Sequence, residues 1–348
     1  MIIKEIFMLF LYNLGIYLYY FAIHCADIFS EKARLWVDGR RNIFAKMNKD
    51  FSKKATDSTT RIWVHCASLG EFEQGRPLIE AIKKEHEDIQ IVLTFFSPSG
   101  YEVRKNYEKA DYIYYLPLDT KKNAKKFLHI VQPDMAIFVK YEFWHHYFSQ
   151  LKQKNVPTFV ISAIFRPSQI FFKPYGKLFR NILKQTTHIF VQNEKSQQLL
   201  QTINVLETSI APDTRFDRVF EHSENVKSLT AIRRFKGKRK MILMGSSWPK
   251  DEKLIVELIH QAVFLENFCF VFAPHEIKSS QMYELEKALH YDTVRYSALE
   301  HSGNWDKKAL IIDNIGMLSS IYQYADYAYV GGGFGAVSYT HLRAHETS

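Results

Sequence analysis

Cysteine is scarce in this chain, which carries only Cys25, Cys66 and Cys269 among 348 residues. Three widely separated thiols cannot build a disulfide framework or a zinc cage, and they are typical of a protein in a reducing compartment. The sequence also lacks the H-E-x-x-H, paired C-x-x-C and clustered D-x-D patterns that indicate a metal site. We therefore expect neither a metal nor a cofactor.

The composition also excludes a disordered or low-complexity protein, because 47% of the residues are hydrophobic and 24% are charged. A chain of 348 residues is long enough for two domains, each with its own core. Lysine and arginine total 46 against 37 acidic residues, a net charge of +9. This excess indicates an anionic partner, which on charge alone is a phosphorylated substrate, a phospholipid surface or a nucleic acid.

No charged residue occurs between positions 6 and 23. That run is at the short limit for crossing a bilayer. It contains Asn13 and four tyrosines, and tyrosines favour the headgroup region, so a helix lying in the interface is an alternative. A buried core helix is a third interpretation. No small-residue cleavage site follows the run, which argues against a removed signal peptide. Basic residues cluster after the run, and this bias predicts that the rest of the chain lies in the cytoplasm. We expect residues 1–30 to be a single N-terminal membrane-anchor helix.

After a linker and helix at residues 31–60, short apolar runs alternate with helical or loop segments. Runs of this length, rich in β-branched and aromatic residues, predict strands of parallel sheets that are buried on both faces. The architecture expected is α/β, with two doubly wound, Rossmann-like domains facing each other and ligands at the carboxyl ends of the strands. The predicted strands are 62–66, 89–95, 112–116, 135–139, 158–161, 188–191, 241–244, 268–272, 310–312 and 327–330.

The first predicted strand leads into Ser68, Gly70 and Glu71. Ser68 and Glu71 have the spacing of a capping box, in which each side chain bonds a free backbone N–H group at the start of a helix. The functional alternative is that Glu71 is a general base on the floor of the cleft. On local grounds alone the capping interpretation is favoured.

Polar and basic residues follow three more strands of the first half. Ser97 and Ser99 precede a helix, where they either bind an anion or simply shape a turn. Lys140 and Glu142 stand beside Phe143 and Trp144, as in a wall that contacts a sugar, and Arg166 lies among further aromatics. Interleaved cations and aromatics also suit single-stranded nucleic acid, but the predicted anchor favours lipid phosphate and argues against nucleic acid.

The second half places polar or glycine-rich segments after its strands. A glycine-rich strand exit lets backbone N–H groups approach a phosphate closely, although GGGFG is neither G-x-G-x-x-G nor a Walker sequence and is weak alone. The candidate donor-side residues are Ser246, Ser247, His275, Glu276, Gly331, Gly332 and Gly333.

Taken together, the segments resemble the lipid A Kdo transferase family, which transfers 3-deoxy-D-manno-octulosonic acid (Kdo) from CMP-Kdo to a lipid A precursor. The resemblance extends in family order from the anchor to about position 335. It rests on WVHCASLGEFEQGRPLIEAI, TFFSPSGYE, YLPLDT, FVKYEFW, SAIFR, FFKPYGKLFR, FVQNEKS, DTRFDRV, GSSWPKDE, FAPHEI and YVGGGFG.

The resemblance implies a GT-B glycosyltransferase of lipopolysaccharide inner-core synthesis at the cytoplasmic face of the inner membrane. It implies that Glu71 is the general base, and with the resemblance this interpretation is favoured over the capping interpretation. It also implies that Glu142 is a second acidic residue important for activity. The acceptor side would include Ser68, Gly70, Ser97, Ser99, Lys140 and Arg166. The expected partners are CMP-Kdo, the lipid A precursor and the membrane, with no nucleic acid and no metal.

The domain boundaries expected are 61–217 for the acceptor-binding domain and 218–336 for a truncated CMP-Kdo-binding domain. Residues 337–348 show no apolar periodicity and resemble translated adapter sequence, so we interpret them as a non-native tail. Two alternatives stay open. One is a GT-B transferase with another sugar nucleotide, and the other is a non-catalytic, membrane-associated nucleotide-binding fragment.

Overall fold

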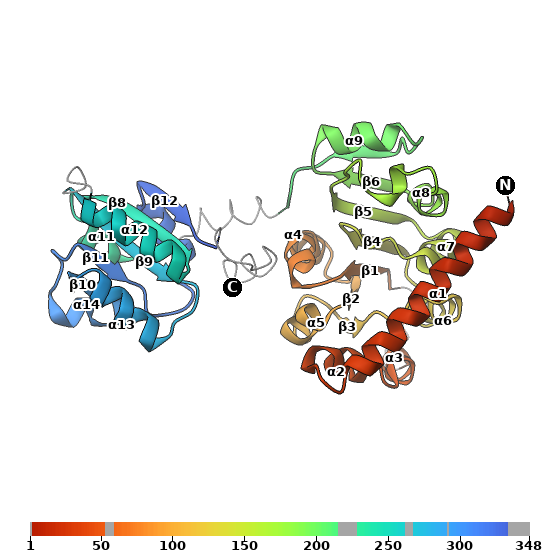
Figure 1. Cartoon of the computed structure of the whole chain (residues 1–348). Coiled ribbons are helices and arrows are strands. Elements are labelled where there is room, and N and C mark those ends of the chain that lie inside the picture. The colour runs from red at the N-terminus through yellow and green to blue at the C-terminus, as the bar shows by residue number, and fades with distance from the viewer. Residues whose placement is uncertain (1, 53–58, 215–227, 262–266, 291, 333–348) are drawn as a thin grey trace. The chain divides into compact units, whose positions relative to one another are not determined.

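The computed structural model describes residues 2–52, 59–214, 228–261, 267–290 and 292–332. Gly333 and the segment 337–348 lie outside these ranges. The chain divides into two compact units, Met1–Phe220 and Glu221–Ser348, and each is built on its own parallel sheet (Figure 1). The α/β class predicted from the apolar runs is confirmed.

Unit 1 contains a seven-stranded sheet in the order β3-β2-β1-β4-β5-β6-β7, with every neighbouring pair parallel. The chain moves outward in one direction from β1 to β3 and then returns to place β4 on the other side of β1. The strand order therefore reverses between β1 and β4. The strands are β1 (Arg61–Cys66), β2 (Gln90–Phe95), β3 (Tyr112–Tyr115), β4 (Met135–Val139), β5 (Thr158–Ala163), β6 (His188–Val191) and β7 (Thr208–Ile210).

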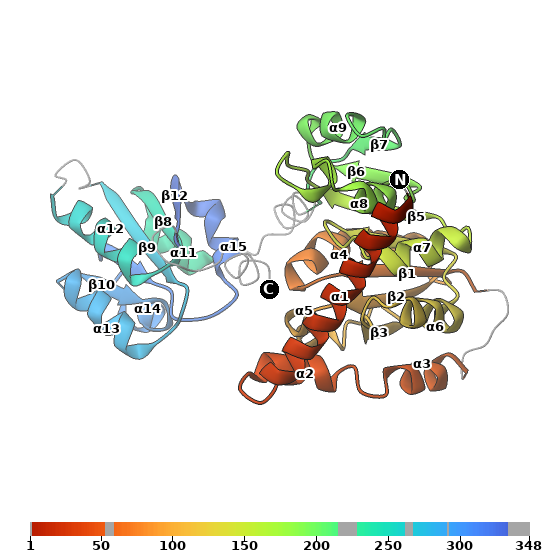
Figure 2. The same cartoon turned by 45° about the vertical axis from the view of Figure 1, so that its right-hand side comes forward.

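Helices cover both faces of this sheet, as the apolar runs predict. Along β1, Trp63 packs with Phe127 and Phe138 on one face, whereas Val64 belongs to the cluster of Phe72 on the other. Helices α4 (Leu69–Glu85) and α5 (Pro98–Arg104) contact each other, as do α3 (Ile43–Ser52), α6 (Lys121–Val131) and α7 (His145–Gln153) in turn (Figure 2). The remaining helices of the unit are α2 (Glu31–Asp38), η1 (Ile170–Phe172), α8 (Lys177–Leu183) and α9 (Glu194–Gln201).

Helix α1 (Ile2–Ala26) lies along unit 1 and contacts α2 and α8 (Figures 1 and 2). Within the described part of the chain, its segment Ile6–Ala26 is the one helical stretch long and apolar enough to cross a membrane. Its middle is tied to the rest of the unit, because the Tyr12 hydroxyl donates to Asp119 Oδ2 over 2.5 Å.

Unit 2 contains a five-stranded parallel sheet in the order β10-β11-β9-β8-β12. All ten predicted strands are present across the two units, whereas β7 and β10, of three residues each, are not among them. The elements of unit 2 are α11 (Thr230–Lys236), β8 (Lys240–Ser247), α12 (Pro249–Gln261), β9 (Phe268–Pro274), α13 (Ser279–Ala288), β10 (Thr293–Arg295), α14 (Tyr296–Ser302), β11 (Ala309–Ile311), α15 (Leu318–Ile321), η3 (Tyr322–Tyr324) and β12 (Tyr327–Val330).

Candidate active site

The reversal of strand order between β1 and β4 marks the place in unit 1 where a ligand is expected. In open parallel sheets, ligands bind outside the carboxyl ends of the strands at such a switch point. The segment after β1 carries Glu71, and the segment after β4 carries Glu142. The fold therefore brings to one edge two carboxylates that stand 71 residues apart in the sequence (142 − 71).

Glu71 lies in the first turn of α4, which begins directly after β1 and Ser68. Ser68 has the extended backbone of an N-cap residue, but its side chain makes no capping bond. Its hydroxyl donates instead to Glu71 Oε2 through a short contact. The reciprocal capping box that the spacing predicts is therefore not formed, and the half-buried Glu71 carboxylate is held by a neighbouring hydroxyl at the carboxyl edge of the sheet.

Glu142 is held by two ring N–H groups. Its Oε2 accepts a hydrogen bond from Trp144 Nε1 at 2.9 Å and lies 3.3 Å from His65 Nε2. The glutamate side chain is 16% exposed, whereas the His65 side chain is fully buried in β1. One carboxylate oxygen is thus fixed by the protein, and the side chain keeps limited access to solvent.

The His65 ring is held in turn by a buried polar chain. Its Nδ1 lies 2.9 Å from Thr94 Oγ1, which accepts a bond from Trp63 Nε1 at 2.8 Å. Each donor in this chain meets an acceptor if the Thr94 hydroxyl donates to His65 Nδ1 and the His65 Nε2–H group donates to the Glu142 carboxylate. The ring is then held in one orientation. The sequence alone does not indicate His65, because a lone histidine in an apolar strand gives no signal of such a chain of hydrogen bonds.

The negative charges of Glu71 and Glu142 both act on Cys66, the last residue of β1. Burial raises the pKa of the Cys66 thiol well above its usual value, and the charges of Glu71 and Glu142 raise it further. Burial likewise raises the pKa of Tyr141, which the Arg166 charge lowers and the Glu71 charge raises. Exposed Arg166, after β5, therefore belongs to the same neighbourhood.

Ser97 and Ser99 shape the turn between β2 and α5. The Ser97 hydroxyl caps α5 by accepting from the Ser99 backbone N–H at 3.3 Å, and the two hydroxyls lie 3.0 Å apart. Gly100 is required for packing, because a Cβ atom there would lie 2.3 Å from the ring of Phe95 and 3.0 Å from the backbone of Ser68. These contacts bring the β2 turn against the β1 turn. Both serines remain half-buried at the site edge.

Two residues at this edge adopt left-handed backbone conformations that non-glycine residues rarely take. Lys140, directly after β4, has φ of 65°, and Ser162, near the end of β5, has φ of 55°. Strain of this kind costs about 1–3 kcal/mol and concentrates at ligand-binding edges. Lys140 immediately precedes Tyr141 and Glu142, so the strained residue lies at the start of the segment that carries the second carboxylate.

Several candidate donor-side residues of unit 2 meet around a buried aspartate, Asp251, that the sequence alone does not indicate. Asp251 Oδ2 accepts from the backbone N–H groups of Gly332 at 2.9 Å and Trp248 at 3.0 Å, while Oδ1 accepts from Tyr329 at 2.8 Å. Gly331 must be glycine, because a Cβ atom would lie 2.4 Å from the Ser246 carbonyl oxygen. Asp251 therefore joins the β8 exit to the β12 exit.

The other donor-side candidates lie at the same edge. Ser246 is buried with φ of 50°, and the Ser247 hydroxyl donates to buried Glu252 over 2.8 Å. Burial raises the pKa of Glu252, while the Ser247 bond lowers it. The His275 ring, after β9, stacks on Trp248 with centroids 4.5 Å apart. Neighbouring Glu276 pairs with Lys278, and that bond lowers the pKa of the Glu276 carboxyl.

Solved structures similar to this chain define the class of fold. The crystal structure of UDP-GlcNAc 2-epimerase from Neisseria meningitidis, bound to UDP-GlcNAc, matches with a TM-score of 0.53 and 15% identity over 79% of this chain and 78% of that one. A putative UDP-N-acetylglucosamine 2-epimerase from Listeria monocytogenes matches with a TM-score of 0.53 and 10% identity, over 79% of this chain and 75% of that one. The two parallel-sheet units thus form a GT-B fold, as predicted.

The family follows from sequence comparison. The profile of the 3-deoxy-D-manno-octulosonic-acid transferase (kdotransferase) family matches residues 40–218, and the chain belongs to this family. A 3-deoxy-D-manno-octulosonic acid transferase of Haemophilus influenzae is 25% identical over 78% of this chain and 65% of its own length. A bifunctional glycosyltransferase/methyltransferase of Fusobacterium nucleatum is 24% identical over 87% of this chain and 47% of its own. The chain spans between about half and two thirds of the length of these relatives.

Proposed function

We propose that this protein is a glycosyltransferase that moves Kdo from CMP-Kdo to a lipid A precursor, lipid IVA, in lipopolysaccharide inner-core synthesis. Membership of the kdotransferase family supports the transferred sugar, and the names of the Haemophilus and Fusobacterium relatives agree with glycosyl transfer. The observation that carries the proposal is the pair of oriented carboxylates, Glu71 and Glu142, at the switch point of unit 1.

The reaction proposed is a single inverting displacement. The acceptor hydroxyl oxygen attacks the anomeric carbon of Kdo while the bond from that carbon to the CMP phosphate oxygen breaks, and CMP leaves with the bonding electrons. Glu71 takes the hydroxyl proton as the new bond forms. The Ser68 hydroxyl bonded to Oε2 fixes the rotamer and leaves Oε1 to face the acceptor. Base catalysis of this kind contributes about 10²–10⁴-fold.

Glu142 has a different role in this proposal, because its Oε2 is already engaged by Trp144 and His65. A carboxylate that accepts two ring N–H bonds is well suited to hold a fixed position and to accept hydrogen bonds from sugar hydroxyls. Lys140 and Arg166 lie on the segments beside it and supply positive charge for the phosphate of an anionic acceptor. Ser97 and Ser99 complete the acceptor side.

The donor is proposed to bind at the carboxyl edge of the unit 2 sheet, near Ser246, Ser247, His275 and Glu276. The backbone N–H groups of Gly332 and Trp248 already donate to Asp251, so in this arrangement they shape the site instead of holding a phosphate. Hydroxyl and imidazole groups at the ends of β8 and β9 are then the direct contacts to the nucleotide. The remaining donor-side candidate, Gly333, lies outside the described residues.

The test of the base is Glu71→Gln, which keeps the size of the side chain and removes its basicity. We expect transfer of Kdo from CMP-Kdo to lipid IVA to fall by at least about 10²-fold with an unchanged melting temperature. Glu85→Gln, an exposed glutamate at the end of the same helix, is the matched control and should retain full activity. Wild-type rates in Glu71→Gln would overturn the assignment of the base.

The donor is tested separately by thermal protection of the protein with CMP, CMP-Kdo and UDP-GlcNAc. Protection by CMP and CMP-Kdo alone supports the proposal. Selective protection by UDP-GlcNAc would replace it with a transferase that uses another sugar nucleotide. Protection by CMP-Kdo without any transfer to lipid IVA would instead identify a non-catalytic nucleotide-binding protein.

A further inference from the structure

Helix α1 has one face that is packed against unit 1. Ile16 and Ile23 lie against the cluster of Trp36, Val37 and Leu118. Tyr19, one helical turn from each of these isoleucines, meets the rings of Trp36 and Phe96 with centroids 5.9 and 5.8 Å away. Positions 12, 16, 19 and 23 follow the spacing of a single helix face, so this face is occupied along most of its length.

Polar bonds fix the middle of the same face. Asp119 Oδ2 accepts from the Tyr12 hydroxyl at 2.5 Å, and the same hydroxyl accepts the His145 backbone N–H at 3.3 Å. The His146 Nε2–H group donates to Asn13 Oδ1 over 2.7 Å. Asp119 is itself buried and also accepts the backbone N–H of His146. Tyr12 and Asn13 thus anchor α1 at the start of α7.

The opposite face of α1 exposes a continuous row of large apolar side chains. Phe7, Leu14 and Phe21, which repeat at intervals of seven, are 58%, 43% and 67% exposed. No charged residue interrupts the segment from Ile6 to Ala26. Other exposed members of this surface, which we call the α1 outer face, are Phe10, Tyr17 and Leu18.

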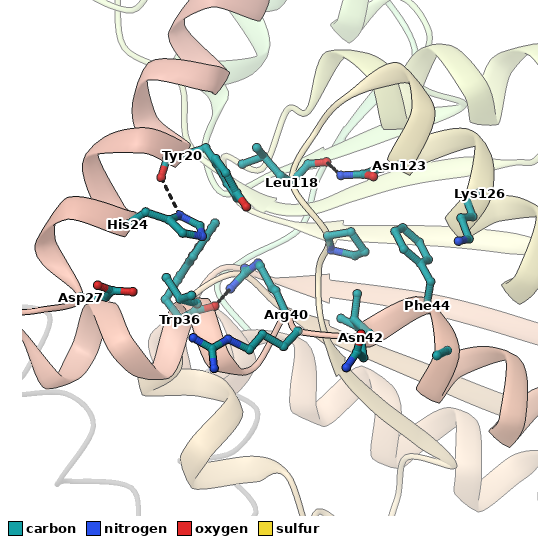
Figure 3. Close-up of a pocket in the computed structure, with 15 residues that line it drawn as sticks. Tyr20, His24, Asp27, Trp36, Arg40, Asn42, Phe44, Leu118, Asn123 and Lys126 are labelled. Carbon is teal, nitrogen blue, oxygen red and sulfur yellow. Dashed lines mark hydrogen bonds between the residues drawn. The ribbon is translucent and has the colours of Figure 1, made fainter.

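A positively charged pocket borders the outer face. It has a volume of about 680 Å³ and lies between α1, the α2–α3 region and the start of α6 (Figure 3). Tyr20 and His24 of α1 line it, opposite Arg40, Arg41 and Lys126, and the acidic residue Asp27 also lines it, so cations outnumber anions by three to one. Because Tyr20 and His24 stand next to Tyr17 and Phe21 on the surface of α1, the pocket opens beside the apolar row.

The guanidinium of Arg40 is a structural part of this pocket. It donates to the backbone carbonyls of Leu116, Trp36 and Phe96 at 2.9, 3.0 and 2.7 Å, and its carbon lies 3.8 Å from the Trp36 ring centroid. Burial lowers its pKa to about 9, so it remains charged at neutral pH. Arg41, whose side chain is 71% exposed and pairs with Asp38, supplies a more accessible cation.

We propose that α1 lies in the plane of an anionic phospholipid leaflet, with the outer face in the acyl region and the cationic pocket against the lipid headgroups. An in-plane amphipathic arrangement buries the apolar row by about 5–10 Å while the packed face keeps all its bonds to unit 1. A spanning helix would place Tyr12 and Asn13 inside the hydrocarbon and separate them from Asp119 and His146. Those groups would then be buried without partners, which costs several kcal/mol for each group.

Charge complementarity favours a lipid leaflet over a second copy of the chain. The outer face has no polar residue between Phe7 and Phe21 except the Tyr17 hydroxyl, and cations flank it on the pocket side. Juxtamembrane cations of this kind are attracted to anionic headgroups. A second identical copy carries the same excess of cations beside its own outer face, so it offers Arg41 and Lys126 no matching anionic surface. The proposal goes beyond the proposed transferase activity and holds whichever sugar is transferred.

The first test measures the depth of three labels on one helix face. In a Cys25→Ser background, where Cys66 and Cys269 are buried, Phe7→Cys, Leu14→Cys and Phe21→Cys each carry a fluorophore. The full chain is reconstituted in phosphatidylcholine vesicles containing phosphatidylglycerol, and lipids brominated at different depths quench the label. We expect one shallow depth for all three positions. A helix that spans the bilayer would place successive labels about 10 Å apart along the membrane normal, which would overturn the proposal.

The second test measures partition of the purified chain to vesicles without any sugar donor, so its result is independent of transferase activity. Phe21→Asn should weaken binding strongly, and Arg41→Gln should weaken it about fivefold on phosphatidylglycerol-containing vesicles only. Leu206→Asn changes a leucine that is 69% exposed elsewhere in unit 1 and should bind like the wild type. Equal binding by Phe21→Asn, or concentration-dependent dimerisation lost in that variant, would reject the lipid surface.

Discussion

The ring of His65, buried in β1, lies 3.3 Å from the carboxylate of Glu142, a residue 77 positions later that follows β4. This contact crosses the switch point of the unit 1 sheet. Together with the 2.9 Å bond from Trp144, it holds one glutamate oxygen in place. His65 contacts no solvent, so any part it takes in the reaction is as a positioning residue that acts through Glu142.

We predict that His65→Gln lowers kcat by about 10–100-fold with little change in KM, because a misplaced catalytic-site group loses rate even when substrate still binds. Thr94→Val, which removes the hydroxyl behind the ring, should have the same effect in weaker form. Steady-state transfer of Kdo measures both parameters. His129→Gln, on the exposed side of α6, is the control. A kcat loss that Thr94→Val does not share would contradict the proposed chain.

The strands were predictable because burial on both faces leaves a direct mark in the sequence. Runs such as 135–139 consist of apolar residues and end at polar ones, and each of these runs is a strand in the structure. The two unpredicted strands, β7 and β10, have three residues each and include Thr208, Ser209, Thr293 and Arg295. Such short polar strands at sheet edges are defined by their pairing partners, which a local pattern cannot show.

Within the site, the sequence indicated Glu71 and Glu142 but not what holds them. The spacing of Ser68 and Glu71 predicted a reciprocal capping box, yet the serine bonds the carboxylate itself. His65 and Asp251 were missed for a shared reason. Their partners, Glu142 and Gly332, are distant in sequence, so only the folded sheet brings them together.

We predict that Gly100→Ala destabilises unit 1 by about 1–3 kcal/mol, because its Cβ would lie 2.3 Å from the buried Phe95 ring. Urea unfolding followed by tryptophan fluorescence measures the change. Gly70→Ala is the matched control, since the nearest atom to its Cβ is Ser68 Oγ at 3.8 Å. That variant should be as stable as the wild type or slightly more stable. A rise in KM for the acceptor in Gly70→Ala would additionally support Gly70 as part of the acceptor surface.

We predict that Asp251→Ala abolishes thermal protection by CMP. The substitution leaves the N–H groups of Gly332 and Trp248 without their acceptor, at about 1–3 kcal/mol each, and releases the Gly331–Gly332 turn. Differential scanning fluorimetry with and without CMP reports both stability and binding. Asp306→Ala, an exposed residue of unit 2, should leave both unchanged. Full CMP protection in a folded Asp251→Ala protein would show that this edge does not bind the nucleotide.

Asp119 accepts a hydrogen bond from the hydroxyl of Tyr12 in α1, and its titration should affect the stability of the protein. Burial raises its pKa to about 6, although the bonds from Tyr12, His146 and Tyr147 lower it. The folded protein therefore binds a proton at Asp119 more readily than the unfolded chain, whose aspartate titrates near 4. The contribution of Asp119 to the free energy of unfolding is therefore present at pH 4 and is lost as the pH rises through about 6. The total loss is roughly 2–3 kcal/mol.

Asp119→Asn removes this titration, so the difference in unfolding free energy between wild type and variant should decrease steadily from pH 4 to pH 7. His146 titrates in the opposite sense, because burial lowers its pKa to about 4 and stability is lost as the pH falls from about 6.5 toward that value. Since His146 is present in both proteins, its contribution cancels in the difference. Urea unfolding at each pH gives the two free energies. A difference that is constant with pH would show that the Asp119 carboxyl is not held in the buried, proton-binding state that joins α1 to unit 1.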